Sequence, residues 1–194
     1  MDAEERLDAR SRRTIGALAC LGILALFLPF LGVPWEYDDK VEILANRVLR
    51  HPTDVAEFVR YNPFRLLLLY SFAADLWAWG FRPEGYRALN ILIHLSNSLL
   101  LMGLLEGVGR RALPRGGSLG VFVAAGTLVF ALHPLAIESV TYVSGRSSSL
   151  ATTFVLLACL GYLAHLELRA DPDVEAWIQA RTRQGNAVLA AVLG

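Results

Sequence analysis

TIGALACLGILALFLPFLGV, from Thr14 to Val33, is the stretch of sequence that decides the fold, because no charged side chain interrupts it. At about 1.5 Å of rise per residue, a helix of this length matches a hydrocarbon thickness of about 30 Å. The run is longer than the apolar region of a signal peptide, and no small-x-small cleavage site follows before Glu36, so we expect it to stay attached. The sequence therefore predicts a membrane span at 14–33.

Three further apolar stretches complete a set of four predicted spans, at about 86–108, 117–135 and 148–168. Hydrophobic residues make up 55% of the chain, which is high for a soluble domain. The apolar stretch that begins at 186 is too short to cross, so we expect the start of a fifth span and a chain that is a fragment. The predicted fold class is an all-α polytopic transmembrane helix bundle, with interfacial helices in a first external loop at 34–85.

The arginines predict the orientation, because short cytoplasmic loops are enriched in Lys and Arg. The tail at 1–13 contains four arginines, and the linker at 110–115 contains three. Both fall on the cytoplasmic side if one span separates them, so the N-terminus is predicted to be cytoplasmic. We expect the bacterial inner membrane, because the chain is rich in Ala, Leu and Arg and its loops are compact.

The segment at 64–79 decides whether that arrangement holds. It is apolar enough to cross, but Asp75 would then lie near the midplane at a cost of about 2.5–3.5 kcal/mol. A crossing would also put the arginine-rich linker outside. We therefore predict an interfacial helix, with Trp77 and Trp79 in the headgroup region. Before it, Asp54 stands at a helix-cap position.

Asn90, His94 and Asn97 are spaced to share one side of the second span. Interhelical hydrogen bonding is the common use of such a polar stripe. The alternative is a cavity lining that a ligand head group enters. The sequence does not decide between interhelical hydrogen bonding and a cavity lining.

Polar residues of both external loops are predicted to meet at one membrane face. The first loop contains Asp38 and Asp39, and the second, at 133–149, contains His133, Glu138 and Arg146. A carboxylate pair can take a proton, and an arginine at a helix start can bind phosphate.

Four segments carry a resemblance to a known class: YDDKVEIL (37–44), YNPFRLLLLYSFAADLW (61–77), GYRALNILIHLSNSLLL (85–101) and FALHPLAIESVTYVSGRSSSLATTFVLLACLGYL (130–163). They resemble the N-terminal half of GT-C class membrane glycosyltransferases, and most of all the TMTC-like O-mannosyltransferases, in which a membrane region is joined to tetratricopeptide repeats. An acidic pair just after the first span is the hallmark of the class. Asp38 and Asp39 stand at that place.

The resemblance implies transfer of a sugar from a polyprenyl-phosphate donor to an acceptor on the outer face, with inversion at the anomeric carbon. It implies Asp39 as the base and Asp38 as its orienting partner or a ligand of a divalent metal ion. Arg146 would bind the lipid phosphate, and the remaining substrate contacts would be His133, Glu138, His94 and Arg65. Arg65 stands near Asn62-Pro63, where many relatives have Arg-Pro.

A second hypothesis is a non-catalytic membrane subunit that packs in a larger membrane complex, with the polar stripe as its interface. Other functions find no support in the sequence. No phosphate-binding glycine loop is present, the histidines and cysteines lack zinc spacing, and the net charge of zero argues against nucleic acid.

Overall fold

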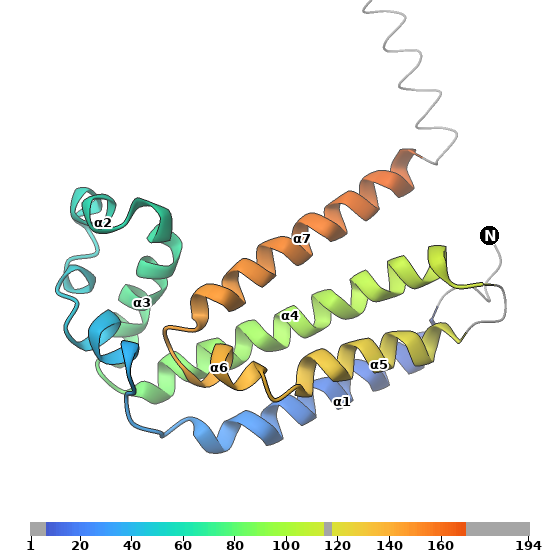
Figure 1. The fold of residues 1–194 in the computed structure, drawn as a ribbon, viewed down its shortest axis with the longest axis horizontal. Coiled ribbons are helices and arrows are strands. Elements are labelled where there is room, and N and C mark those ends of the chain that lie inside the picture. The colour runs from blue at the N-terminus through green and yellow to red at the C-terminus, as the bar shows by residue number, and fades with distance from the viewer. Residues whose placement is uncertain (1–6, 115–117, 170–194) are drawn as a thin grey trace, which may run out of the picture.

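The computed structural model describes residues 7–114 and 118–169, and these residues form helices and connecting loops (Figure 1). Four helices run side by side: α1 (Ala9–Phe27), α4 (Pro83–Ala112), α5 (Leu119–Leu132) and α7 (Arg146–Arg169). Helix α4 is central, because α1, α5 and α7 all pack against it. The predicted all-α membrane helix bundle is confirmed.

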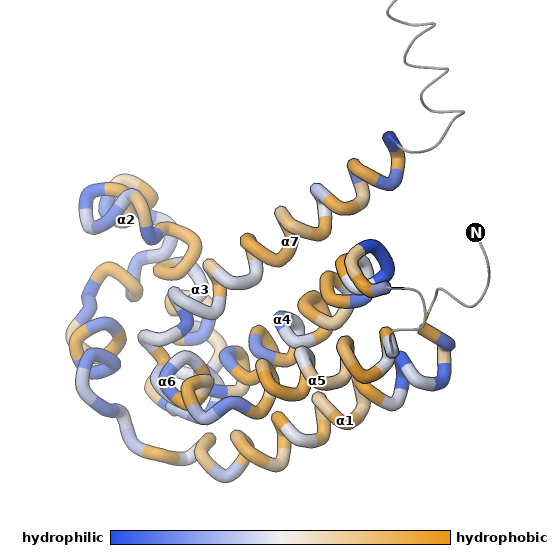
Figure 2. Tube along the Cα trace, turned by 45° about the vertical axis from the view of Figure 1, so that its right-hand side comes forward, coloured by the Kyte–Doolittle hydropathy of each residue, from blue (hydrophilic) through white to orange (hydrophobic). Residues whose placement is uncertain are grey.

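Three helical stretches are long and apolar enough to cross a membrane, namely 9–30, 83–112 and 146–169, and α5 is a shorter apolar helix. Figure 2 shows hydrophobic colour along α1, α5 and α7, with hydrophilic residues concentrated toward the two ends of the bundle. An apolar outer surface together with polar ends is what a bilayer requires of a helix bundle. The chain is a membrane protein.

Two helix boundaries differ from the predicted spans. Helix α1 begins at Ala9 and not at 14, because the Asp8 side chain accepts a hydrogen bond from the Ser11 N–H and caps an earlier turn. Helix α5 ends at Leu132 and not at 135, because Pro134 has no N–H and favours an extended residue before it. After this break the chain forms the short helix α6 (Ala136–Thr141).

Residues 7–13 and 110–114 lie at the same end of the bundle, since Arg12 of α1 forms an ion pair at 3.5 Å with Glu106 near the end of α4. Glu106 is also 3.2 Å from Arg110. The residues at 31–82 and 133–145 lie at the opposite end (Figure 1).

Residues 31–82 form a compact layer, the loop layer, that contains α2 (Val55–Tyr61) and α3 (Leu66–Trp79). Asp54 caps α2 by accepting a hydrogen bond from the Glu57 N–H at 3.0 Å, as its position in the sequence predicts. Helix α3 lies across the end of the bundle and not alongside α4 (Figure 1). One long helix, α4, therefore separates the loop layer from the linker at 110–114.

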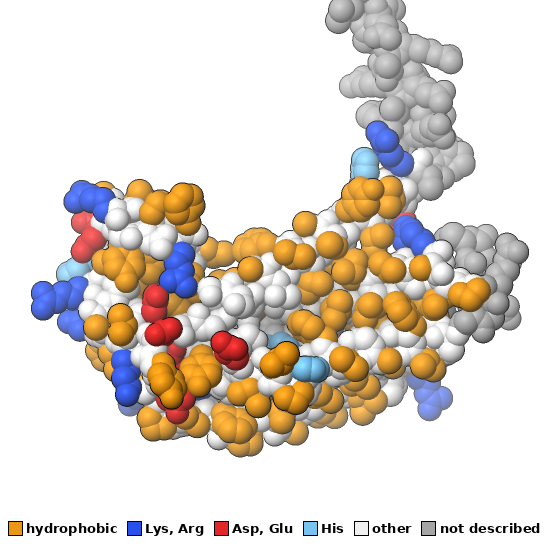
Figure 3. All heavy atoms as spheres, viewed as in Figure 1, with side chains coloured by type: hydrophobic (Ala, Val, Ile, Leu, Met, Phe, Trp, Pro, Cys, Tyr) orange, Lys and Arg blue, Asp and Glu red, His pale blue; other side chains and the backbone are white. Residues whose placement is uncertain are grey.

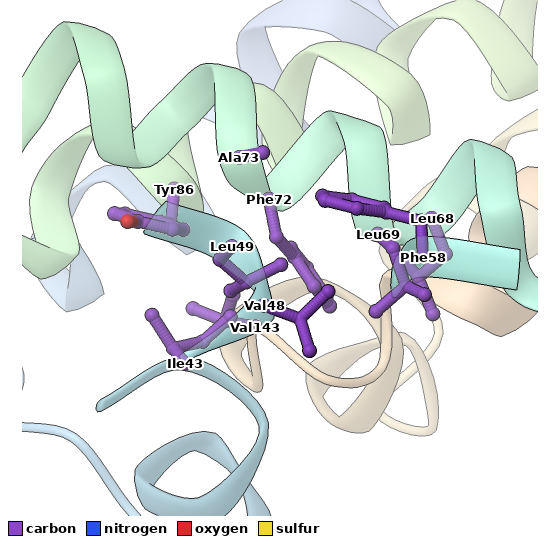
Figure 4. Packing of buried hydrophobic residues seen from close by; sticks show 10 residues of the cluster. All are labelled: Ile43, Val48, Leu49, Phe58, Leu68, Leu69, Phe72, Ala73, Tyr86 and Val143. Atoms are coloured by element: carbon purple, nitrogen blue, oxygen red, sulfur yellow. The ribbon is translucent and has the colours of Figure 1, made fainter. Parts of the chain in front are cut away.

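The loop layer has its own hydrophobic core (Figure 4). Phe58 of α2 and Phe72 of α3 are fully buried there, and Tyr86 and Val143 join them from the bundle. The remaining members are Ile43, Val48, Leu49, Leu68, Leu69 and Ala73. Burial of this many apolar side chains gives the first loop a defined shape. Trp77 is 89% exposed, which fits the interfacial helix of the predicted fold class. The predicted fifth span at 186–194 lies outside the described residues.

Candidate functional site

A polar hollow of about 730 Å³ lies where the loop layer meets α6 and the start of α7. We call it the acidic hollow. In Figure 3, acidic side chains gather at this end of the molecule, whereas apolar side chains cover much of the bundle. The hollow is lined by Tyr37, Asp38, Glu42, Arg65, Pro134, Leu135, Ile137, Glu138, Tyr142, Ser144, Gly145, Ser147 and Ser148.

Three carboxylates and one guanidinium belong to this lining, from Asp38, Glu42, Glu138 and Arg65. Arg65 donates to Glu42 Oε1 at 3.0 Å, and the Arg65 side chain is 40% exposed. Glu42 Oε2 is buried without a hydrogen-bond partner among the described residues.

The predicted pair of adjacent aspartates is divided between two environments. Asp38 lines the acidic hollow. Asp39 is fully buried, and its two carboxylate oxygens accept hydrogen bonds from the Val143 N–H at 3.2 Å and the Ser144 N–H at 2.8 Å. Asp39 therefore fastens the first loop to the second in this structure, and its expected role as the base stays a prediction.

A glycine allows the second loop to close against α6. A Cβ atom at Gly145 would collide with the backbone carbonyl oxygen of Glu138, so the turn before α7 has no room for a side chain there. The Gly145-Arg146 dipeptide consequently brings the start of α7 close to α6.

Arg146 also differs from its predicted position. Its side chain is fully buried, and its guanidinium donates to Asn90 Oδ1 at 2.7 Å, Ser71 Oγ at 2.9 Å and the Tyr86 carbonyl at 2.9 Å. It stacks on the Phe72 ring, with its central carbon 4.8 Å from the ring centroid. Because these partners surround the guanidinium, Arg146 joins α3, α4 and α7 and does not line the acidic hollow.

Arg146 pairs with Asp75, the residue whose charge makes a membrane-crossing helix at 64–79 unfavourable. Asp75 Oδ2 lies 2.6 Å from an Arg146 amino group, although the angle is not that of a hydrogen bond. Burial raises the pKa of the Asp75 carboxyl, while the charge of Arg146 and its contact with the carboxylate oppose the rise. The pair fixes α3 on the bundle.

Arg87, in the first turns of α4, is a buried polar residue that was not predicted from the sequence. Its buried guanidinium donates to four backbone carbonyls, those of Leu31, Val33, Pro34 and Thr141. It thereby joins the end of the first span to the second loop. A charged residue at the start of a long apolar helix is the signal that could have found it.

The side chains of the polar stripe form hydrogen bonds with other residues of this chain. Asn90 donates to the carbonyls of Val140 and Tyr142, at 3.2 and 3.0 Å. His94 Nε2 is 3.0 Å from the Ala131 carbonyl, and Asn97 donates to the Ser149 carbonyl at 2.8 Å. These contacts match the interhelical reading. An interface with another subunit is not needed to explain the stripe.

The two predicted histidines lie beside a second cavity, of about 440 Å³, which His94 and His133 line together with α5 and α7 residues. They are not part of the acidic hollow. Within residues 7–114 and 118–169, no group of three or more His, Cys, Asp or Glu side chains has the arrangement of a metal site. The divalent metal ion expected from the resemblance stays a prediction.

A bundle of apolar helices with a charged hollow at one end defines an integral membrane protein that presents its polar chemistry at the membrane surface. By sequence, this chain is a relative of the TMTC O-mannosyltransferases, as the motifs of its two loops indicate.

The comparisons behind this relation span most of the chain. Protein O-mannosyl-transferase Tmtc2 of Drosophila melanogaster is 30% identical over 184 residues, which cover 87% of this chain and 19% of that protein. Human TMTC2 is 30% identical over 160 residues, 75% of this chain and 18% of the relative. Mouse TMTC4 is 29% identical over 151 residues, 65% of this chain and 20% of the relative. The chain spans about a fifth of the length of these curated relatives. No family model and no solved structure matches it.

Proposed function

We propose that the chain belongs to a GT-C-like membrane glycosyltransferase, which transfers a sugar, mannose by analogy with its named relatives, from a polyprenyl-phosphate donor to an acceptor on the outer face. One observation carries the proposal: three carboxylates and an arginine meet in the acidic hollow at one end of a membrane helix bundle. The hollow has the size of a small-ligand site, which runs to about 300–1,000 Å³.

Asp38 is the base in this proposal. It accepts the proton of the acceptor hydroxyl while that oxygen attacks the anomeric carbon. The bond from the anomeric carbon to the phosphate oxygen breaks on the opposite face, and its electron pair leaves with the polyprenyl phosphate. The resemblance implies Asp39 for this role, but we propose Asp38 because Asp38 lines the hollow, whereas Asp39 is buried with both oxygens hydrogen-bonded.

Arg65 is the phosphate contact in this proposal. It is the basic residue among the described lining of the hollow, and its side chain is partly exposed. A guanidinium stabilises the negative charge that grows on the leaving phosphate. Glu138 accepts hydrogen bonds from sugar hydroxyls. Arg146 and Asp39 hold the walls of the hollow, and His133 lies at its edge, beside Leu135.

We also propose an orientation of the chain in the membrane. The loop layer and the hollow face outward, and the end with the tail and linker arginines faces the cytoplasm. A bacterial inner membrane stays a prediction from composition.

The test replaces Asp38 by Asn in the whole protein, reconstituted with polyprenyl-phosphate mannose and an acceptor peptide. Sugar transfer is expected to fall by about 10²–10⁴-fold, the usual contribution of general-base catalysis. Asp54→Asn is the matched control, because it removes a carboxylate from the same loop and Asn caps a helix as well as Asp does. Transfer by Asp38→Asn within tenfold of the wild type would count against the proposal.

A further inference from the structure

Two tyrosines line the acidic hollow, one from the loop layer and one from the second loop. Tyr37 directly precedes Asp38, and Tyr142 follows the last residue of α6. Their ring centroids are 6.4 Å apart, and the two ring planes are tilted by 53°. Tyr37 is 79% exposed, so its ring is free to contact a ligand. The charged groups of the hollow therefore have an aromatic surface beside them.

The backbone of Tyr37 has a conformation that a large side chain seldom adopts. Its φ is 39°, in the left-handed region that favours glycine. The turn is closed by the Asp39 N–H, which donates to the Glu36 carbonyl at 2.9 Å, and by the Lys40 N–H, which donates to the Tyr37 carbonyl at 3.2 Å. Strain of this kind is frequent at ligand sites. Glycine would form the same turn without strain, so the reason for a ring here lies outside the stability of the turn.

Both rings belong to backbone segments that hydrogen bonds hold together. Asp39, two residues after Tyr37, accepts two backbone N–H groups of the second loop, at 3.2 and 2.8 Å. The Tyr142 carbonyl accepts from the Asn90 amide at 3.0 Å. These bonds fix the two backbone positions before a ligand arrives, which lowers the entropic cost of binding.

The hollow offers partners for both kinds of surface on a pyranose ring. Hydroxyl groups on the edge of the sugar donate to carboxylates, and Asp38 and Glu138 line the hollow. The axial C–H bonds gather on one face of the sugar, which is apolar and weakly positive. The negative face of a tyrosine ring attracts such a surface. A sugar ring thus uses the carboxylates and the aromatic surface together, whereas a phosphate uses only the guanidinium.

We propose that Tyr37 and Tyr142 form an aromatic wall that binds the apolar face of the transferred sugar, with Tyr37 as the main contact. The inference rests on the proposed function and adds the residues that select the sugar. In mannose, the axial hydrogens H3 and H5 lie on one face, and the axial hydroxyl at C2 lies on the other. The aromatic wall therefore accepts mannose and disfavours a sugar with an axial hydroxyl at C3.

The test uses the whole protein in lipid nanodiscs, with mannose 1-phosphate as a water-soluble probe. Saturation-transfer difference NMR reports which protons of the probe contact the protein. In the wild type, H3 and H5 should receive the strongest saturation. Tyr37→Phe keeps the ring and should keep this pattern. Tyr37→Leu removes the ring and should abolish the preference for H3 and H5.

Kinetics with polyprenyl-phosphate mannose give a second readout. Tyr37→Leu should raise KM for this donor by about 3–10-fold, the size of an aromatic contact, with kcat changed less than twofold, because the contact is made in the ground state and in the transition state alike. Tyr37→Phe should stay within twofold of the wild type. Trp77→Leu is the matched control, because Trp77 is an aromatic residue of the loop layer that is 89% exposed and is not part of the hollow lining. It should also stay within twofold.

Tyr37→Gly covers the case in which Tyr37→Leu fails to fold, because glycine adopts this φ without strain. Saturation and KM that Tyr37→Leu and Tyr37→Gly both leave unchanged would overturn the inference. So would an equal rise of KM in Trp77→Leu, because the exposed aromatic residues would then act as anchors in the headgroup region. Sugar transfer by the wild type with an unchanged pattern in Tyr37→Leu contradicts only the aromatic wall. Ring-dependent saturation in a protein without sugar transfer contradicts only the proposed function.

Discussion

Replacing Arg146 by Met should destabilise the protein by about 3–5 kcal/mol, because it leaves the buried Asp75 carboxylate without its partner. The guanidinium is fully buried, lies 2.6 Å from Asp75 and donates three further hydrogen bonds. Met fills a similar length and carries no charge. Adding Asp75→Asn should restore a large part of the loss and leave about 1–2 kcal/mol for the other hydrogen bonds.

The loss should depend on pH in a direction that follows from Asp75. Burial already raises the pKa of this carboxyl above 3.8, and removal of the Arg146 charge raises it further. A carboxyl with a higher pKa in the folded state binds more protons when folded. Below its unfolded pKa of about 3.9 it therefore does not lower the free energy of unfolding. The loss in free energy of unfolding grows as the pH rises toward the folded pKa, and above that pKa the loss is constant. Arg146→Met should therefore regain about 1.4 kcal/mol per pH unit on acidification through this window, and the double variant should not.

Thermal unfolding in detergent, followed by near-ultraviolet circular dichroism, measures the effect. By the scaling of soluble proteins, about 3–5 kcal/mol lowers the midpoint by roughly 6–20 °C. The control is Arg65→Met, whose ion pair with Glu42 has side chains 40% and 22% exposed and should contribute less than about 1 kcal/mol. A midpoint for Arg146→Met within about 3 °C of the wild type, or the same loss with Asp75→Asn already present, would refute the reasoning.

Two further variants test the remaining buried polar contacts. Arg87→Met removes the donors to four carbonyls and should lower stability by about 3 kcal/mol or more, with faster hydrogen exchange at residues 31–34; unchanged exchange there would contradict its role. Asn97→Leu breaks hydrogen bonds between α4 and α7 and should cost about 0.6–1.7 kcal/mol in the same thermal assay; a stabilised variant would show that these bonds do not hold the two helices together.

Much of the fold follows from the sequence, because membrane spans depend on local properties. The length of an uncharged run decides whether a helix can cross, and the run at 14–33 overlaps the candidate span 9–30 over residues 14–30. The cap at Asp54 and the break at Pro134 are equally local. The cost of burying Asp75 in lipid predicted a helix at 64–79 outside the set of spans, and α3 lies across the end of the bundle (Figure 1).

The candidate site was less predictable, because its contacts join distant parts of the chain. Adjacent residues in a turn point in different directions, so the sequence could not tell which of Asp38 and Asp39 faces the hollow. Arg146 finds Asp75 in a helix far away along the chain, and spacing gives no signal for such a pair. The carbonyl partners of Arg87 are backbone atoms, which every residue has.

The polar stripe of α4 has a consequence for biosynthesis. Asn90, His94 and Asn97 bond to residues that follow them by 37 to 52 positions, and Arg87 precedes Thr141 by 54. At about 5–20 residues per second, the ribosome delivers Thr141 roughly 3–11 s after Arg87. During that interval the nascent second span has polar groups that its own chain has not yet supplied with partners. The polar side chains of α4 thus need water or a shielded site at the translocon until α5 and α7 have been synthesised.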